Sequence, residues 1–252
     1  MKILVLLSQV PDTTARIAFT NDNTQFDASG VTFIVNPYDE WFALVRALEL
    51  KEAAGAGSVT TITVGGADTD ATIRKGLAIG ADEAVRVDVQ PTEALQVAEQ
   101  VAAYAKDKGF DLILAGKETI DYNGGQVGAM VAELLDLPYI ALASKLDLSR
   151  NDAGGTTATV ERDVPGGVEV MEVNLPFALS AAKGMAEQRI PNMRGIMAAR
   201  TKPLTVIPAV ATDNVATTKS FELPPPKGAV KMIPAEDAGK LIEMLHTEAK
   251  VI

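Results

Sequence analysis

Residues 111–138, DLILAGKETIDYNGGQVGAMVAELLDLP, decide the fold. The apolar run at residues 112–115 is typical of a buried parallel strand, and apolar side chains recur at helical spacing over residues 127–135. Asn123-Gly124-Gly125 stands just before that helix. Glycines let a ligand approach the free N–H groups of a helix N-terminus, which favour an anion such as phosphate. The pattern indicates either a phosphate-binding loop or an ordinary glycine-rich connection between a strand and a helix.

The chain before this stretch alternates strand-like segments with helix-like segments. Strands are predicted at residues 2–10, 59–64 and 83–89, and helical patterns follow each of them in turn. Such alternation predicts βαβ units that build a parallel sheet. The motif Asn36-Pro37-Tyr38-Asp39 is predicted to begin the first helix, with Asn36 as its N-cap and Pro37 as its first residue.

The loops at one edge of this sheet are the candidate binding site. Ligands of parallel sheets bind beyond the carboxyl ends of the strands. Residues 8–12, 65–68 and 116–126 are expected to meet there, and residues 36–39 are expected to lie beside them.

After residue 138 the pattern changes. Residues 141–148 and 156–162 are predicted to form a β-hairpin around a turn signal at residues 151–155. Further strands are predicted at residues 168–173 and 177–181. The sequence therefore predicts an α/β fold, in which a parallel-sheet, Rossmann-like domain carries a β-hairpin extension.

Residues 183–202, here called the basic segment, reverse the local charge. Its charged residues are Lys183, Arg189, Arg194, Arg200 and Lys202 against Glu187. In a chain of net charge −10, such a reversal suggests a surface for an acidic partner. Met193, Ile196 and Met197 would add adaptable apolar contacts. The alternative is a solvated basic loop whose methionines lie in the core.

Residues 208–252 predict an extended arm that ends in an amphipathic helix. The arm contains Pro224-Pro225-Pro226 and shows little periodicity before its last residues. Such an arm docks either on its own domain or on another subunit. We predict a domain of residues 1–207, which includes the basic segment, and an arm of residues 208–252.

Composition removes several classes of function. The chain has no Cys and one His, His246, which argues against thiol catalysis, iron–sulfur ligation and a Ser-His-Asp triad. The net charge of −10 argues against nucleic acid as a partner. No run reaches the roughly 18 apolar residues of a membrane span, and the N-terminal apolar run is short for a signal peptide. We expect a cytoplasmic protein without membrane insertion.

Known catalytic fingerprints are absent as well. The sequence lacks G-x-G-x-x-G after the first strand, a P-loop and a G-x-S-x-G elbow. Its carboxylates are scattered and mark no acid–base pair. We therefore predict no side-chain catalysis, and any redox chemistry would need a bound organic cofactor.

Four blocks of sequence carry a family resemblance. They are VNPYDEWFALVRALELKE at 35–52, TIRKGLAIGADEAVRV at 72–87, GKETIDYNGGQVGAMVAELLDLP at 116–138, and VERDVPGGVEVMEVNLPFALSA at 160–181 with RIPNMRGIMAARTKP at 189–203. The chain resembles the beta subunit of an electron transfer flavoprotein over essentially its whole length. The resemblance implies an adenine-nucleotide-binding domain and no catalysis by the subunit's own side chains.

The resemblance also implies cofactors and the residues that face them. A partner alpha subunit would hold most of the redox FAD, with Thr13 and Tyr38 of this chain facing the flavin. A structural AMP would lie in this chain. The matching nucleotide positions are Leu6, Asn36, Pro37, Tyr38, Asp39, Val64, Gly116, Lys117, Asp121, Asn123, Gly124, Gly125, Gln126 and Val127.

The resemblance implies protein partners too. The arm would dock on the alpha subunit, and Asp163 matches an acid that faces an arginine of that subunit. The basic segment matches a recognition loop for dehydrogenases such as acyl-CoA dehydrogenases, with Met193 as its apolar anchor. Its matching contact residues are Arg189, Met193, Arg194, Ile196 and Met197. Electrons would pass on to a membrane quinone oxidoreductase.

Three alternatives stay open. Some relatives hold a second FAD in place of AMP and bifurcate electrons. A free-standing nucleotide-binding module of the universal stress type would explain the sheet, but not the arm or the basic segment. A nucleotide hydrolase or ligase of the same fold group should carry a Ser-Gly-Gly loop after the first strand, where this chain has Ser8-Gln9-Val10-Pro11.

Overall fold

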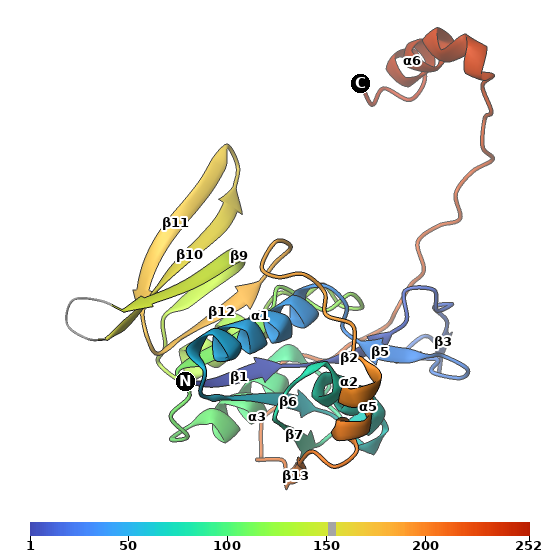
Figure 1. Ribbon diagram of the computed structural model, residues 1–252. Coiled ribbons are helices and arrows are strands. Elements are labelled where there is room, and N and C mark those ends of the chain that lie inside the picture. The colour runs from blue at the N-terminus through green and yellow to red at the C-terminus, as the bar shows by residue number, and fades with distance from the viewer. Residues whose placement is uncertain (151–154) are drawn as a thin grey trace.

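A large twisted sheet forms the centre of the molecule (Figure 1). The structure is a computed structural model that describes residues 1–150 and 155–252. The strands of the central sheet are β1 (Lys2–Leu6), β6 (Ser58–Val64), β7 (Glu83–Asp88), β8 (Leu112–Gly116), β9 (Tyr139–Arg150), β10 (Thr156–Val164), β11 (Gly167–Asn174), β12 (Phe177–Ala181) and β13 (Leu204–Pro208).

The order of these strands is β11-β10-β9-β12-β8-β1-β6-β7-β13. Every neighbouring pair from β9 across to β13 is parallel. In contrast, β10 runs antiparallel to both β9 and β11. The predicted parallel sheet and its β-hairpin extension are therefore confirmed, and residues 151–154 of the predicted turn at 151–155 lie outside the described residues.

Helices cover both faces of the sheet. They are α1 (Asp39–Ala54), α2 (Asp70–Ile79), α3 (Ala94–Ala105) and α4 (Val127–Leu134). Two further helices are α5 (Met193–Ala199), which packs on α2, and α6 (Ala238–Thr247), which ends the arm. Strand side chains alternate between faces, so Ile3 and Val5 join the core under α1 and α2. Leu4 and Leu6 join a second core under α3 and α4. Because both faces are buried, the strands are nearly continuous in apolar residues.

Smaller elements lie at the carboxyl edge of the sheet. β2 (Gln9–Pro11) pairs with β5 (Phe33–Val35), and β3 (Phe19–Thr20) pairs with β4 (Gln25–Phe26). Single turns of 3₁₀ helix, Ala67–Thr69 and Ala235–Asp237, precede α2 and α6. The two pairs form separate two-stranded sheets beside the central one.

Two sequence-based expectations are wrong. Asn36 is not the N-cap of α1 and Pro37 is not its first residue, because the helix begins at Asp39 and Tyr38 occupies the capping position. The reason is that the side chain of Asn36 bonds to a different loop, as described below. Strand β13 was not predicted. It is a short edge strand ending at Pro208, which is compatible only with such a position.

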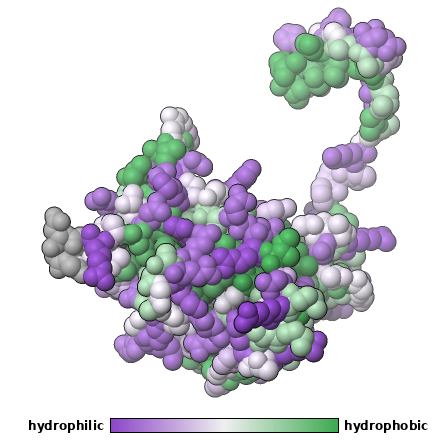
Figure 2. All heavy atoms as spheres, in the orientation of Figure 1, coloured by the Kyte–Doolittle hydropathy of each residue, from purple (hydrophilic) through white to green (hydrophobic). Residues whose placement is uncertain are grey.

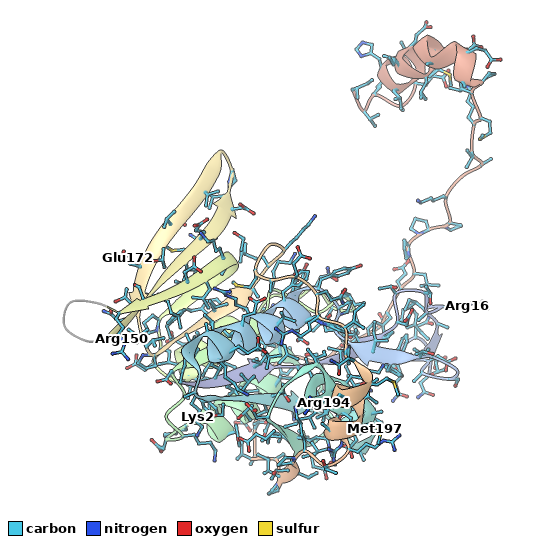
Figure 3. The ribbon with its side chains drawn as sticks, in the orientation of Figure 1. Lys2, Arg16, Arg150, Glu172, Arg194 and Met197 are labelled. Carbon is cyan, nitrogen blue, oxygen red and sulfur yellow. The ribbon has the colours of Figure 1, made fainter. Side chains whose placement is uncertain are left out.

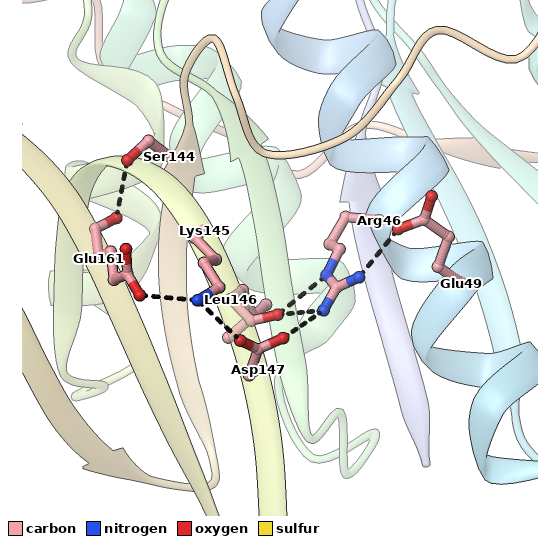
Figure 4. A network of polar contacts seen from close by, with 7 residues as sticks. All are labelled: Arg46, Glu49, Ser144, Lys145, Leu146, Asp147 and Glu161. Carbon is pink, nitrogen blue, oxygen red and sulfur yellow. Dashed lines mark hydrogen bonds and ion pairs between the residues drawn. The ribbon is translucent and has the colours of Figure 1, made fainter.

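The β-hairpin extension is tied to the body through α1 (Figure 4). Both Nε and Nη2 of Arg46 donate to the carbonyl of Leu146, at 2.9 Å from Nε. The same guanidinium lies 3.0 Å from Asp147 and 2.9 Å from Glu49. On the outer side, Lys145 pairs with Glu161 at 2.8 Å. Arg46 therefore fixes the direction in which the hairpin leaves the sheet.

The C-terminal arm leaves the body after β13 (Figure 1). It is held first by Gln100, whose side chain exchanges hydrogen bonds of 2.9 and 2.8 Å with the backbone of Val210. It is held again where the rings of Phe19 and Phe221 stack at 5.0 Å. Beyond that point α6 stands away from the body, and its apolar side chains are open to solvent (Figure 2).

Among the described residues, no helix is both long and apolar enough to cross a lipid bilayer.

Replacing Arg46 with Met should destabilise the protein by about 1–3 kcal/mol, because the carbonyl of Leu146 loses its charged donors. Urea denaturation measures the change. The matched control is Lys145→Met, which breaks only exposed ion pairs and should cost less than about 1 kcal/mol. Equal losses for both variants would contradict the assigned role of Arg46.

Candidate functional site

The loops at the carboxyl ends of β1, β6 and β8 meet at one edge of the sheet. The backbone N–H of Asn36 donates to the carbonyl of Ser8 at 2.9 Å. The side chain of Gln9 donates to Asp68 at 3.2 Å and accepts from Thr72 at 2.7 Å. Residues 8–12, 36–39 and 65–68 therefore converge as expected for a parallel sheet.

Asn36 joins this edge to the loop that follows β8. Its side-chain nitrogen donates to the carbonyl of Glu118 at 2.9 Å, and its side-chain oxygen accepts from the N–H of Ile120 at 3.1 Å. Asn36 is fully buried. A buried amide with both ends satisfied holds its partners rigidly, since breaking either bond leaves a polar group without water. Asn36 thus fixes the start of the 116–126 loop.

Tyr38 has an unusual backbone and an exposed ring. Its φ of 64° and ψ of −98° lie in a region that costs a non-glycine residue about 1–3 kcal/mol. The ring is 57% exposed and leans on Phe42 at a centroid distance of 6.4 Å. The fold therefore holds an aromatic surface outward, directly beside the buried Asn36.

Glu40 is a buried acid beneath the same edge. Its carboxylate accepts hydrogen bonds from the N–H of Ser8 at 2.6 Å and from the Ser8 hydroxyl at 2.7 Å. Burial raises the pKa of Glu40 to about 8, although the bonds from Ser8 act in the opposite direction. Gly116 lies flush against it, because a Cβ at that position would come within 2.7 Å of the Glu40 nitrogen.

Charges above Glu40 are partly balanced. Burial raises the pKa of Asp39, and the nearby Lys117 opposes that rise. Lys117 pairs with Glu118 at 2.9 Å, which raises the pKa of the lysine. A cation is therefore held at the mouth of the loop, next to the first turn of α1.

The turn before α4 offers free donors. Asn123 adopts a left-handed φ of 49° and, like Gly124, Gly125 and Gln126, it is exposed. Within the described part of the chain, the N–H groups of residues 124–126 donate to no other backbone group. They lie directly before Val127, the first residue of α4. Exposed N–H groups at a helix N-terminus suit a phosphate.

The remaining predicted nucleotide positions fall around these groups. Leu6 and Val64 are the last residues of β1 and β6, so both lie at the carboxyl edge. Asp121 is exposed in the 116–126 loop and its carboxylate accepts from the N–H of Tyr122 at 2.9 Å. Thr13 is exposed after β2. The structure thus gathers the strand ends and loop residues at one edge.

The basic segment is not the plain loop expected from its sequence. It contains α5, which Asn192 caps by accepting from the N–H of Gly195 at 2.8 Å. Met193 and Met197 are 74% and 57% exposed, and Figure 3 shows Met197 and Arg194 at the surface of this helix. The expectation of core methionines fails for these two residues. Of the methionines in the segment, only Met185 is buried.

Arg189 and Asp163, which are also predicted to contact partner proteins, lie in different surroundings. Arg189 is paired bidentately with Glu52 of α1, at 2.7 and 3.1 Å. This pairing raises the pKa of Arg189 and lowers that of Glu52. Asp163 is exposed near the end of β10, which lies three strands away from β8 in the order of the sheet. The strand order thus separates Asp163 from the loop that Asn36 holds.

Sequence reasoning missed the pair of Ser8 and Glu40. The one available signal was a polar residue directly after the apolar run of β1. Among the described residues, no group of His, Asp and Glu side chains is arranged to hold a metal ion. What the edge offers instead is backbone N–H groups, an exposed aromatic ring and a fixed cation.

Comparisons with known proteins give the family. A family model described as "Electron transfer flavoprotein domain" matches residues 24–212. The chain is 38% identical to electron transfer flavoprotein subunit beta of Bacillus subtilis (strain 168), over 100% of both chains. It is 37% identical to the protein of that name from Syntrophomonas wolfei, over 100% of this chain and 98% of the relative. For the Homo sapiens protein of that name the identity is 34%, over 94% of each chain. The chain belongs to the electron transfer flavoprotein beta-subunit family.

Replacing Asn36 with Ala should loosen the loop that follows β8. The Ile120 N–H loses its acceptor, so its hydrogen exchange should accelerate roughly tenfold or more. Exchange measured by NMR tests this. Asn192→Ala removes the single bond of an exposed asparagine and should leave Ile120 unaffected. An unchanged Ile120 rate in the Asn36 variant would refute the assigned role.

Glu40 should make stability depend on pH. A raised folded pKa means that the folded state binds the proton more tightly, so this stabilisation is complete below about pH 4.5 and is lost as pH rises through about 8. In that window the free energy of unfolding should fall by up to about 1.4 kcal/mol per pH unit. Glu40→Gln should flatten the profile measured by denaturation from pH 5 to 8, whereas Glu133→Gln, at an exposed site, should not.

Proposed function

We propose that this member of the electron transfer flavoprotein family is the nucleotide-holding subunit of a heterodimeric electron carrier. It would accept electrons from dehydrogenases, such as acyl-CoA dehydrogenases, onto FAD held mainly by an alpha subunit, and pass them to a membrane quinone oxidoreductase. The observation that carries the proposal is similarity to beta subunits over the full length of the chain. The expected cytoplasmic location stays a prediction.

The carboxyl edge fits an adenine nucleotide such as AMP. The N–H groups of residues 124–126 are exposed and can donate to a phosphate at the start of α4. Lys117 adds a positive charge at the mouth of the same loop. Both polar atoms of the Asn36 side chain bond to the loop, so Asn36 holds the loop in place without using these atoms to bind the ligand. The bound AMP would be structural, joining the 116–126 loop to α4.

The same edge can face a flavin on its outer side. Tyr38 presents an exposed ring that the backbone holds outward, and Thr13 is exposed after β2. FAD would supply the electron-accepting chemistry when bound by the partner. The contribution of this chain would be an aromatic surface and exclusion of water from one side of the flavin.

The arm and the hairpin suit docking on the alpha subunit. In α6, Leu241 and Ile242 are 45% and 61% exposed. The helix itself stands away from the body of the chain (Figure 2). In the edge strand β11, Val168 and Val170 are also exposed. Apolar surface of this extent is typical of a subunit seen without its partner. Asp163, at the end of β10, would face an arginine of that partner.

The basic segment suits docking on electron donors. Its apolar side chains Met193 and Met197 project into solvent from a capped helix, with Arg194 between them. Methionine and arginine are both enriched at protein interfaces, so this arrangement suits a docking surface. Chemistry by the side chains of this chain is not part of the proposal, which makes the subunit an electron carrier and not an enzyme.

Two alternatives can be separated from this proposal. In a bifurcating flavoprotein, the nucleotide at the carboxyl edge would be a second FAD. In a stand-alone module of the stress type, the ligand would be ATP with no flavin. Co-expression with the neighbouring alpha-subunit gene, followed by a count of nucleotides released from the purified complex, decides among them. One FAD and one AMP per heterodimer is the expected result; a colourless monomer would refute the proposal.

Replacing Met193 with Ala should weaken docking on the donor. The side chain is the most exposed apolar group of α5, so its loss should raise the KM for the heterodimer about tenfold with little change in kcat. Steady-state assays with an acyl-CoA dehydrogenase measure this. Leu134→Ala removes an exposed apolar side chain at the end of α4, outside the proposed docking surfaces, and serves as the control. Equal effects of both substitutions would count against the docking role.

A further inference from the structure

A groove of about 890 Å³ lies between the start of α1, helix α2 and the basic segment. Its walls are mostly apolar and include Trp41, Pro191 and Ile196. Ile196 is 42% exposed, so it belongs both to the groove and to the open face of α5. The groove is therefore continuous with the apolar side chains that α5 presents to solvent.

The walls of the groove are fixed. A Cβ at Gly195 would lie 2.4 Å from the carbonyl of Ala78, so α5 sits directly on the end of α2 and only glycine allows this approach. Arg74 of α2 donates to the carbonyls of Ala199 and Lys202, both at 2.7 Å. In return, Lys202 donates to carbonyls near the end of α2, including Ala81 at 2.6 Å.

Each helix end is thus capped by a cation from the other element. Such caps satisfy carbonyls that a helix leaves free and oppose its dipole. On the opposite wall, Trp41 donates through Nε1 to the carbonyl of Arg189 at 3.1 Å, and Arg189 is held by Glu52. A hollow whose walls are held by these contacts will not close on itself when it is empty.

The rim of the groove is positive. Arg74, Lys75 and Arg200 line it, in a chain whose net charge is −10. Lys75 and Arg200 are exposed, and neither makes an ion pair within the described residues. No acidic residue lines the groove among those described. Cations around an apolar hollow favour a segment that carries an apolar side chain between carboxylates.

We infer that this groove receives a segment of the electron-donating dehydrogenase that carries an apolar side chain flanked by acidic residues. The dehydrogenase would then contact α5 on the side that lines the groove as well as at its exposed methionines. The inference rests on the proposed function. The donor is preferred over other occupants because the groove shares Ile196 with the exposed face of α5 and carries the opposite charge to the rest of the chain.

The test uses the heterodimer and an acyl-CoA dehydrogenase from the same organism. Trp41 is the only tryptophan of this chain, so 5-fluorotryptophan incorporated before assembly gives one fluorine signal inside the groove. That signal should shift when the dehydrogenase is added. The double variant Lys75→Glu, Arg200→Glu should raise the KM for the heterodimer about tenfold or more. Lys106→Glu, an exposed lysine at the end of α3, is the matched control.

Each outcome bears on one claim. A fluorine shift with the alpha subunit alone, and none with the dehydrogenase, overturns the inference and assigns the groove to the alpha subunit. A KM for the double variant within twofold of the Lys106→Glu value also overturns it.

The Met193→Ala variant separates the groove inference from the proposed docking role. If Met193→Ala raises the KM for the heterodimer while the groove variant does not, only the groove inference fails. If neither raises it, the docking role of the basic segment fails. Flavin content per heterodimer is the check on folding.

Discussion

The hydrogen bonds of the Asn36 side chain hold the functional edge of this protein together. They join the turn before α1 to the loop after β8, two segments 82 and 84 residues apart in sequence. Because Asn36 is fully buried, neither bond can be exchanged for one to water. The residues that follow Asn36 are arranged around this edge. Tyr38 is turned outward, Asp39 begins the helix, and Glu40 is pressed against Gly116 and Ser8.

In the function proposed above, this site would work through the placement of groups and not through reactive side chains. Donors for a phosphate would come from the backbone before α4, and the surface for a flavin would come from one exposed ring. The proposed contacts with other proteins would be distributed around this edge. The β-hairpin, which Arg46 ties to α1, and the arm, which stacks on Phe19 through Phe221, both extend outward. Helix α5 packs directly on α2 at Gly195. The proposed electron carrier would need such fixed surfaces, because its electrons would be exchanged between bound cofactors.

The fold could be predicted from sequence where periodicity was strong. The buried strand at residues 112–115 and the helix after it were both found, and alternation of such units implied the parallel sheet. Asn36 was misassigned because an asparagine before Pro37 matches a helix cap, whereas its true partners lie in a loop that no local pattern reveals. The packing of α5 on α2 and the pairing of β13 with β7 likewise depend on contacts between residues distant in sequence. At the site, the glycine-rich turn could be predicted, but the Ser8–Glu40 pair beneath it could not.

The central claim is that the carboxyl edge is a preformed adenine-nucleotide site that Asn36 keeps in shape. Hydrogen–deuterium exchange of the full chain, with and without AMP, tests it most directly. We expect AMP to slow exchange in residues 36–40 and 116–127 together, and to leave the hairpin of β10 and β11 unchanged. Exchange that is the same with and without saturating AMP in both edge segments would contradict the account.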